Sequence, residues 1–300
     1  MSGTAAAITS ELDALVFTPT AGAPNTSSKT TFTLSDLSSA NGAPVVDSKT
    51  SVIDSDPAQP PPTITSSILF QNTDGQVSIW EMNGISIVGG GPVADPGPSW
   101  RAVGTGDFND DSHSDILLQN TAGQVSVWEM NGNNIINGGP VANPGPSWHA
   151  VGTGDFNDDK HSDILMQNTS SGEVSVWEMN GNKIIGGGSV ADPGPSWRAV
   201  GTGDFNDDGH SDILMQNTSS GQVSVWEMNG NKIIGGGPVA DPGPSWHAVG
   251  TGDFNDDKHS DILMQNTGGQ VSIWDMNGNK IIGGGPVANP GPNWHGIGLT

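Results

Sequence analysis

The stretch WHAVGTGDFNDDKHSDILMQNTSSGEVSVWEMNGNKIIGGGSVADPGPS, residues 148–196, recurs along most of the chain and decides the fold. Each copy carries two tryptophans, and successive members of either series are 48, 49, 49 and 48 residues apart. The first series is Trp80, Trp128, Trp177, Trp226 and Trp274, and the second is Trp100, Trp148, Trp197, Trp246 and Trp294. The two series use all ten tryptophans, so the repeat organises the chain.

Within one copy, four short segments have strand character and are separated by turn signals. In the quoted copy these are residues 148–156, 163–168, 173–179 and 182–188, named here strands A, B, C and D. Asn180-Gly181, between strands C and D, predicts a type I′ hairpin turn. Four strands in 40 to 50 residues, without helical periodicity, are typical of a β-propeller blade. The rival architecture is a parallel β-helix, whose coils are usually shorter.

The two ends of the repeat region complement each other. The region begins with strands B, C and D in residues 68–80 and onward, and it ends with strand A alone in residues 294–300. Joined, these pieces complete one blade. The sequence therefore predicts an all-β propeller of five four-stranded blades, closed by pairing of the N-terminal strands B to D with the C-terminal strand A, which removes a free sheet edge. The alternative is a piece of a longer array.

The first part of the chain differs in composition from the repeats. Residues 1–65 are rich in Ser, Thr, Ala and Pro, and PAQPPP at 57–62 precedes the first blade. We expect residues 1–65 to be partly β or a disordered linker, and residues 66–300 to form the propeller. The N-terminal segment resembles the tail end of a bacterial cadherin-like or Ig-like repeat.

Charge excludes some functions. The chain has 9 Lys and Arg against 32 Asp and Glu, a formal charge of −23, and no cysteine. Such a charge repels nucleic acid and anionic membrane surfaces, so we expect no nucleic-acid partner. No stretch approaches the roughly 20 apolar residues of a membrane span, so we expect no membrane insertion. Cations are the natural partners.

The acidic residues gather in the four complete loops between strands A and B, which read D-x-N-x-D-x-x-x-D. Alternate residues there supply hard oxygen atoms, the ligands that Ca²⁺ takes in a shell of six to eight, and the backbone carbonyl at position 7 is a further candidate. The sequence predicts about four Ca²⁺ ions, one per loop. The candidate ligands are Asp107, Asn109, Asp111, His113 and Asp115; Asp155, Asn157, Asp159, His161 and Asp163; Asp204, Asn206, Asp208, His210 and Asp212; and Asp253, Asn255, Asp257, His259 and Asp261.

Through GTGDFNDDxHSDIL in all four loops, residues 66–300 resemble the FG-GAP or VCBS repeat family, bacterial relatives of integrin α-subunit propellers. The resemblance implies calcium-binding loops and an extracellular recognition or adhesion module, and it implies no substrate. The chain departs from the usual loop at position 4, where Asp replaces Gly. At position 6 only Gly209 is glycine. If position 6 needs a positive φ, we expect the third loop to bind calcium most tightly, because a residue other than Gly costs about 1 kcal/mol there.

No catalytic residue is expected. Each loop contains His-Ser-Asp, such as His161, Ser162 and Asp163, but adjacent strand residues point to opposite faces and cannot converge as a triad. Glu129 and Glu178 recur in blade after blade, which is unlike the single carboxylate pair of a glycosidase. The chain is therefore expected not to be an enzyme.

The tryptophans leave the ligand open. Those of the PSW and PNW motifs lie next to Pro- and Gly-rich loops and are candidate ligand-binding residues: Trp100, Trp148, Trp197, Trp246 and Trp294. Aromatic faces stack on sugar rings, and repeated pockets between blades give avidity. We expect an extracellular or cell-surface recognition or adhesion module that binds a glycan or a protein. The alternatives are a multivalent lectin and a structural spacer in a larger surface protein.

Overall fold

A computed structural model describes residues 27–36, 45–55, 64 and 66–296. The chain divides into two compact units, Met1–Thr63 and Ile64–Thr300. In the first unit, β1 (Ser27–Asp36) pairs antiparallel with β2 (Val45–Ser55). The resemblance of this unit to a cadherin-like or Ig-like repeat stays a prediction, because most of residues 1–65 lie outside the described ranges. No helix in the described ranges is long and apolar enough to span a membrane.

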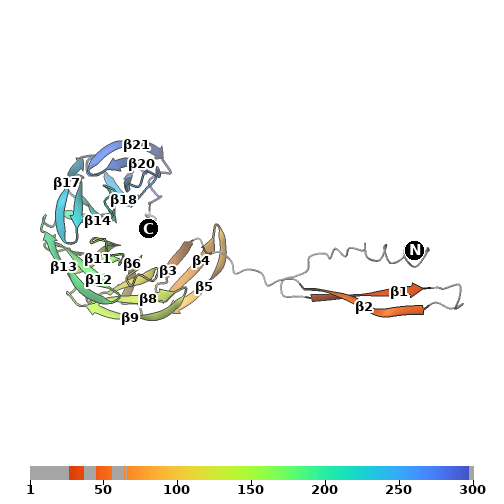
Figure 1. Cartoon of the computed structure of the whole chain (residues 1–300). Coiled ribbons are helices and arrows are strands. Elements are labelled where there is room, and N and C mark those ends of the chain that lie inside the picture. The colour runs from red at the N-terminus through yellow and green to blue at the C-terminus, as the bar shows by residue number, and fades with distance from the viewer. Residues whose placement is uncertain (1–26, 37–44, 56–63, 65, 297–300) are drawn as a thin grey trace. The chain divides into compact units, whose positions relative to one another are not determined.

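The second unit is a β-propeller of five blades that follow one another in chain order around an arc (Figure 1). Blade 1 consists of β3 (Ser66–Gln71), β4 (Val77–Asn83) and β5 (Ser86–Ala94). Blade 2 consists of β6 (Trp100–Gly106), β7 (Asp115–Asn120), β8 (Val125–Asn131) and β9 (Asn134–Ala142). Blade 3 consists of β10 (Trp148–Gly154), β11 (Asp163–Asn168), β12 (Val174–Asn180) and β13 (Lys183–Ala191). Blade 4 consists of β14 (Trp197–Gly203), β15 (Asp212–Asn217), β16 (Val223–Asn229) and β17 (Lys232–Ala240). Blade 5 consists of β18 (Trp246–Gly252), β19 (Asp261–Asn266), β20 (Val271–Asn277) and β21 (Lys280–Ala288).

The predicted fold class is thus confirmed, and strand B of the quoted copy has the predicted bounds. Neighbouring strands pair antiparallel, in the order A, B, C, D in blades 2 to 5 and B, C, D in blade 1. The fourth strand is longer than predicted and runs to Ala191, because the Gly-rich stretch continues the ladder with bulges opposite β12. Strand B is buried at five of its six positions, since both faces of the blade pack against neighbours.

The turn between strands C and D corrects one prediction. Asn180 pairs with Lys183, so the two central turn residues are Gly181 and Asn182 rather than Asn180 and Gly181. Gly181 has a φ of +58°, whereas Asn182 is not among the residues with positive φ. That pattern belongs to a type II′ turn, not to type I′. The Asn182 amide then reaches back to the carbonyl of Pro140 in the preceding blade at 3.4 Å.

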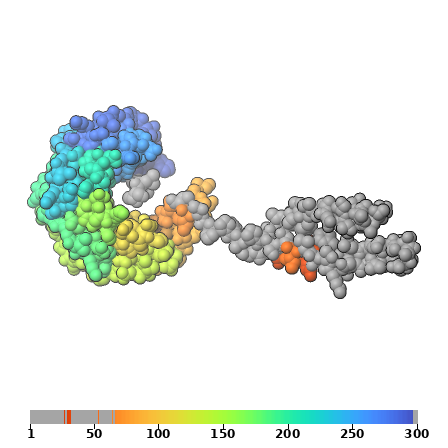
Figure 2. All heavy atoms as spheres, in the orientation of Figure 1, coloured from red at the N-terminus to blue at the C-terminus, as the bar shows by residue number. Residues whose placement is uncertain are grey.

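The core lies between blades rather than within one of them. Phe108, Val125 and Val127 of blade 2 pack with Ile164, Met166 and Met179 of blade 3 in one fully buried cluster. Equivalent clusters fill the other seams between successive blades. Each blade therefore depends on its neighbours for burial, as repeat units generally do. Figure 2 shows the blades in contact along the arc around a hollow.

A glutamine at the end of each strand B holds the innermost strand of the next blade. Gln119 donates through Nε2 to the carbonyl of Trp148 at 2.7 Å and accepts the Ala150 amide at 3.0 Å. The same bracket recurs at the end of the repeats, where Gln265 holds the Trp294 carbonyl at 2.8 Å and the Gly296 amide at 2.8 Å. Residues 294–296 are therefore held as the inner strand of a following blade would be.

The pairing of that C-terminal segment with blade 1 stays a prediction. Residues 297–300 lie outside the described ranges. Among the described residues, blade 1 has three strands. Ile68 and Phe70 of β3 are 41% and 40% exposed, whereas their counterparts Ile116 and Leu118 are buried. The end face of blade 1 thus exposes apolar side chains of the kind that a neighbouring blade covers elsewhere.

Candidate metal loops

The four acidic loops connect strand A to strand B at the same place in blades 2 to 5, and they share one backbone shape. In the second loop, Asp158 at position 4 and Lys160 at position 6 have φ values of 57° and 71°. Position 6 is thus left-handed, as the sequence suggested. Position 4 is left-handed too, which Asp tolerates better than most residues because its side chain hydrogen-bonds locally. The equivalent residues are Asp110 and Ser112, Asp207 and Gly209, and Asp256 and Lys258.

This shape turns the oxygens of positions 1 and 3 towards one point. Asp155 Oδ1 and Asn157 Oδ1 both accept the backbone N–H of Asp159, each at 3.1 Å. The second carboxylate oxygen of Asp155 accepts the Lys160 amide at 2.8 Å. Asp159 is tied to the same group, because its Oδ2 accepts the Asn157 side-chain amide at 2.9 Å. Positions 1, 3 and 5 are therefore joined in one hydrogen-bonded group.

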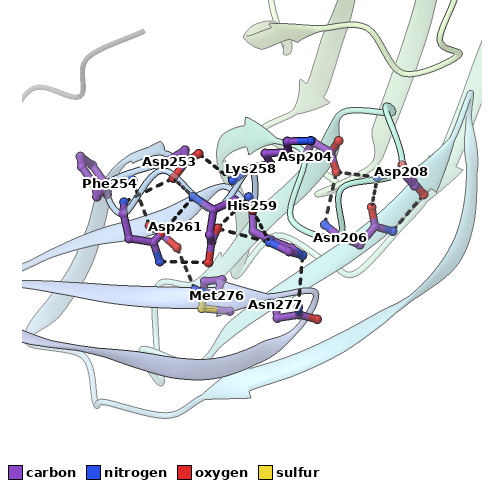
Figure 3. A network of polar contacts seen from close by, with 12 residues as sticks. Asp204, Asn206, Asp208, Asp253, Phe254, Lys258, His259, Asp261, Met276 and Asn277 are labelled. Carbon is purple, nitrogen blue, oxygen red and sulfur yellow. Dashed lines mark hydrogen bonds and ion pairs between the residues drawn. The ribbon is translucent and has the colours of Figure 1, made fainter.

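The pattern repeats in the remaining loops. Figure 3 shows it for Asp204, Asn206 and Asp208, in which Asn206 donates to Asp208 at 2.9 Å. The corresponding bond from Asn109 to Asp111 is 3.1 Å, and that from Asn255 to Asp257 is 3.0 Å. Four near-copies of one loop thus present the same carboxylate and amide groups.

Position 9 has a different environment from the one the spacing suggested. Asp163 is 0% exposed. Its Oδ2 accepts the Phe156 amide at 2.9 Å and its Oδ1 accepts the Met179 amide at 2.8 Å. Figure 3 shows the same arrangement for Asp261, between Phe254 and Met276. This carboxylate therefore braces the loop against strand C.

Burial shifts the titration of these bracing carboxyls. Loss of solvent raises the pKa of Asp163 to about 7, opposed by the two amide hydrogen bonds and reinforced by the charges of Asp159 and Asp155. Burial likewise raises the pKa of Asp212 to about 7 and that of Asp115 to about 6. By contrast, the hydrogen bond from the His259 amide lowers the pKa of Asp257. In the fourth loop, burial raises the pKa of Asp261, so the pKa values of positions 5 and 9 are shifted in opposite directions.

The side chains at positions 1, 3 and 5 carry the hard oxygen atoms that calcium takes as ligands, and hydrogen bonds join these three side chains in each loop. Position 9 of each loop is turned to the backbone amides, and across the described residues no three His, Asp or Glu side chains form a group that could hold a metal ion. The structure thus brings together three of the predicted side chains per loop and does not bring the fourth.

The loop histidines lie beside the carboxylates of position 5. The side chain of His161 is 17% exposed, and its Nδ1 lies 3.2 Å from Asp159 Oδ1. Its Nε2 lies 3.1 Å from the Asn180 side-chain amide. His113 is the more open member, at 46%. The side chain at position 7 thus orients the carboxylate at position 5, while the role of its backbone carbonyl stays a prediction.

The loops also contact one another from blade to blade, which the sequence did not reveal. The Ser162 amide donates to the carbonyl of Asp107 in the preceding loop, and the Gly181 amide donates to the carbonyl of Phe108, both at 2.6 Å. Equivalent bonds link Ser211 to Asp155 and Ser260 to Asp204. These hydrogen bonds therefore couple the backbone of each loop to the backbone of the next loop.

The candidate tryptophans lie in the seams between blades. Trp100, Trp148, Trp197 and Trp246 are partly buried, and each packs against an interblade apolar cluster. Trp294 is 68% exposed, because no further blade covers it within the described residues. Packing against these clusters thus covers part of the indole in four of the five candidate tryptophans.

A family model described as an FG-GAP-like repeat matches three tandem stretches, residues 107–166, 155–215 and 204–264. Each match starts at the first aspartate of one loop and runs into strand B of the next blade. The loops and the strands between them therefore form the matched unit. A search of curated proteins found no match.

Solved structures of similar shape are distant in sequence. The computationally designed Ika8 protein is 15% identical, with a TM-score of 0.40, over 73% of this chain and 58% of its own. The dihydro-heme d1 dehydrogenase NirN is 12% identical, with a TM-score of 0.43, over 83% of this chain and 49% of its own. The Dos1 propeller is 11% identical, with a TM-score of 0.46, over 76% of this chain and 69% of its own. The chain thus spans about half of the length of the first two proteins.

Proposed function

The chain belongs to the FG-GAP-like repeat family, and from this premise we propose that it is a calcium-binding, non-enzymatic recognition or adhesion module that works outside the cell. The observation that carries the proposal is the fourfold recurrence of one loop, in which hydrogen bonds join the Asp, Asn and Asp side chains at positions 1, 3 and 5. Evenly spaced acidic loops on a rigid scaffold suit bound cations.

Calcium would be held by the side chains of positions 1, 3 and 5, with backbone or water oxygens completing the shell, because both oxygens of the position 9 aspartate already accept backbone amides. A divalent ion in the loop supplies positive charge beside carboxylates that otherwise repel one another. The residues of the chain position those carboxylates: Asp155 is fixed by two backbone amides and Asp159 by Asn157 and His161. Hard oxygen ligands and a flexible loop favour Ca²⁺ over softer metals.

Ion binding would stabilise the propeller as a whole. A ligand that binds the folded state alone adds about 2.7 kcal/mol at a hundredfold excess over its dissociation constant. Because the Ser162 amide bonds to the Asp107 carbonyl, an ion that orders one loop also orders the contact with its neighbour. Calcium is therefore proposed as a brace between blades.

A recognition role is supported by the repetition of surfaces that the blades present. Nearly identical blades offer one surface several times, and linked copies of a weak site bind with high avidity. The chemical groups in the loops are carboxylates and amides already engaged with the backbone, which suits structural ions more than catalysis. The partner is proposed to be an extracellular glycan or protein.

The test combines a stability measurement with a binding screen. Melting of the purified chain would be followed by tryptophan fluorescence in 2 mM calcium and in excess EGTA, which the proposal expects to differ by more than 5 °C. Glycan and protein arrays would then be probed in both buffers. Equal melting temperatures would contradict the calcium proposal. A large difference with no partner on either array would favour a calcium-braced spacer.

A further inference from the structure

A cavity of about 210 Å³ lies on the face of blade 2 that is turned towards blade 1. Its lining residues are Pro96, Trp100, Leu118, Ser126 and Trp128. Ser126 pairs with Leu118 across neighbouring strands, so the floor is the sheet itself. Trp100, Leu118 and Trp128 also pack with Val77 and Ile79 of β4, which places the cavity in the seam.

The lining defines the chemistry of an occupant. Two indoles and a proline form apolar walls, and the Ser126 hydroxyl is the one polar side chain among the lining residues. No charged side chain lines the cavity. A chain with a net charge of −23 also disfavours an anionic ligand. The occupant is therefore neutral, with an apolar face for the indoles and a hydroxyl for Ser126.

The size of the cavity limits the occupant to a single ring. A dry cavity of about 150 Å³ accommodates benzene, so this one, at about 210 Å³, takes a six-membered ring with its substituents. A pyranose has that size, a face of C–H groups that stacks on an indole, and hydroxyls on its rim. A peptide segment of several residues would not fit inside.

Blade 2 differs from its copies at the floor of the cavity. The residue equivalent to Leu118 is Met166 in blade 3, Met215 in blade 4 and Met264 in blade 5. Methionine is longer and flexible, and it fills gaps in apolar cores. Leu118 is 0% exposed, so the extra length of a methionine at this position would have to extend into the space between the neighbouring side chains. The other lining residues recur in blade 3 as Pro144, Trp148, Ser175 and Trp177.

We propose that this cavity binds one neutral pyranose ring of a glycan, stacked between Trp100 and Trp128 and hydrogen-bonded to Ser126. The proposal rests on the recognition function proposed above and names the class of its ligand. It assigns this one ring to blade 2, in addition to the repeated surfaces through which the proposed module would bind its partner. Leu118 is the residue that distinguishes it.

The test measures binding of neutral methyl glycosides of mannose, galactose, glucose, fucose and N-acetylglucosamine to the calcium-loaded chain by saturation-transfer NMR. We expect saturation transfer from at least one of them, and a loss of at least fivefold in affinity in Leu118→Met and in Trp100→Ala. The matched control is Met166→Leu, which makes the same exchange in the opposite direction in blade 3 and should leave that affinity in place.

Three results would overturn the proposal: no binding by any glycoside, full binding by Leu118→Met and Ser126→Ala, or binding of phenol and indole without any glycoside. The melting temperature of each variant is read in the same buffer, so that loss of fold is recognised. Calcium binding is measured separately by calorimetry. A chain that binds calcium but no sugar defeats this inference alone, whereas a chain that binds no calcium defeats the proposed function.

Discussion

The carboxylate of Asp163 accepts the backbone amide of Met179 at 2.8 Å, while its other oxygen accepts that of Phe156 at 2.9 Å. One fully buried side chain thereby joins the acidic loop to the third strand of its blade. The relationship repeats in blades 2, 4 and 5 with Asp115, Asp212 and Asp261. The aspartate that closes each loop motif is therefore also part of the blade core.

Replacing this carboxylate should destabilise the fold even without calcium. In Asp163→Ala, two buried amides lose their acceptor, and each unsatisfied group costs about 1 to 3 kcal/mol. We expect the free energy of unfolding in EGTA, measured by urea titration, to fall by about 2 to 6 kcal/mol. Asp158→Gly is the matched control, because it removes an exposed carboxylate at a positive φ and should not destabilise. If Asp163→Ala leaves the free energy of unfolding unchanged, the two hydrogen bonds of Asp163 do not contribute to stability.

The residue at position 6 should influence the calcium affinity of each loop. Lys160 and Lys258 have φ values of 71° and 73°, where glycine is favoured by about 1 kcal/mol. Lys160→Gly should therefore strengthen calcium binding at the second loop by up to about fivefold, and Gly209→Lys should weaken the third by a similar factor. Calorimetry on variants that retain one loop each would measure this. A third loop that binds most weakly would contradict the prediction.

The raised pKa values give the metal-free protein a pH dependence of definite sign. Burial raises the pKa of Asp163 and Asp212 to about 7, so between about pH 4 and pH 7 the folded state binds more protons than the unfolded state. The free energy of unfolding in EGTA should therefore fall as the pH rises through this window. Excess calcium favours the ionised carboxylates and should reduce or reverse the fall.

The measurement for this prediction is urea unfolding at half-unit intervals from pH 4 to pH 8, in EGTA and in calcium. Asp163→Asn with Asp212→Asn serves as the control, because amides do not titrate in this range and the slope in EGTA should flatten. The His259 amide lowers the pKa of Asp257, so this group contributes a slope of the opposite sign, confined to the acidic end of the window where the unfolded carboxyl still titrates. Stability that rises with pH in EGTA would show that these carboxyls are not the dominant groups.

Closure of the ring is open to a direct chemical test, since the chain has no cysteine. By analogy with the pairing of Ala150 and Met166 in blade 3, Gly296 should lie opposite Phe70 of β3. The double variant Phe70→Cys, Gly296→Cys should form an intramolecular disulfide under mild oxidation. The pair Phe70→Cys, Val287→Cys, with its second cysteine on the exposed outer strand, should not. Equal cross-linking of both pairs would leave the pairing unsupported.

The propeller could be predicted because its signal is repeated and local. The two tryptophan series set the blade period, and the apolar run of residues 163–168 marked the buried strand B, which has the predicted bounds. The C to D turn was assigned to the wrong type because Asn-Gly is compatible with several registers, and the pairing of Asn180 with Lys183 decides among them. Register is a property of two strands, which a dipeptide does not reveal.

The site was predictable in its residue types and less so in its geometry. Spacing placed Asp155, Asn157 and Asp159 together, because alternate residues of a tight loop converge. It also placed Asp163 with them, whereas burial and two amide donors draw that carboxylate into the blade. The bond from the Ser162 amide to the Asp107 carbonyl joins loops 48 residues apart, according to the repeat spacing, and only the tertiary fold shows it.

The central claim is that the four acidic loops bind calcium, and calorimetric titration of calcium into the EGTA-treated, desalted chain tests it most directly. The account predicts about four ions per chain, and the loss of one ion for each of Asp107→Asn, Asp155→Asn, Asp204→Asn and Asp253→Asn. The absence of binding heat together with an unchanged melting temperature, or a stoichiometry that survives all four substitutions combined, would contradict it.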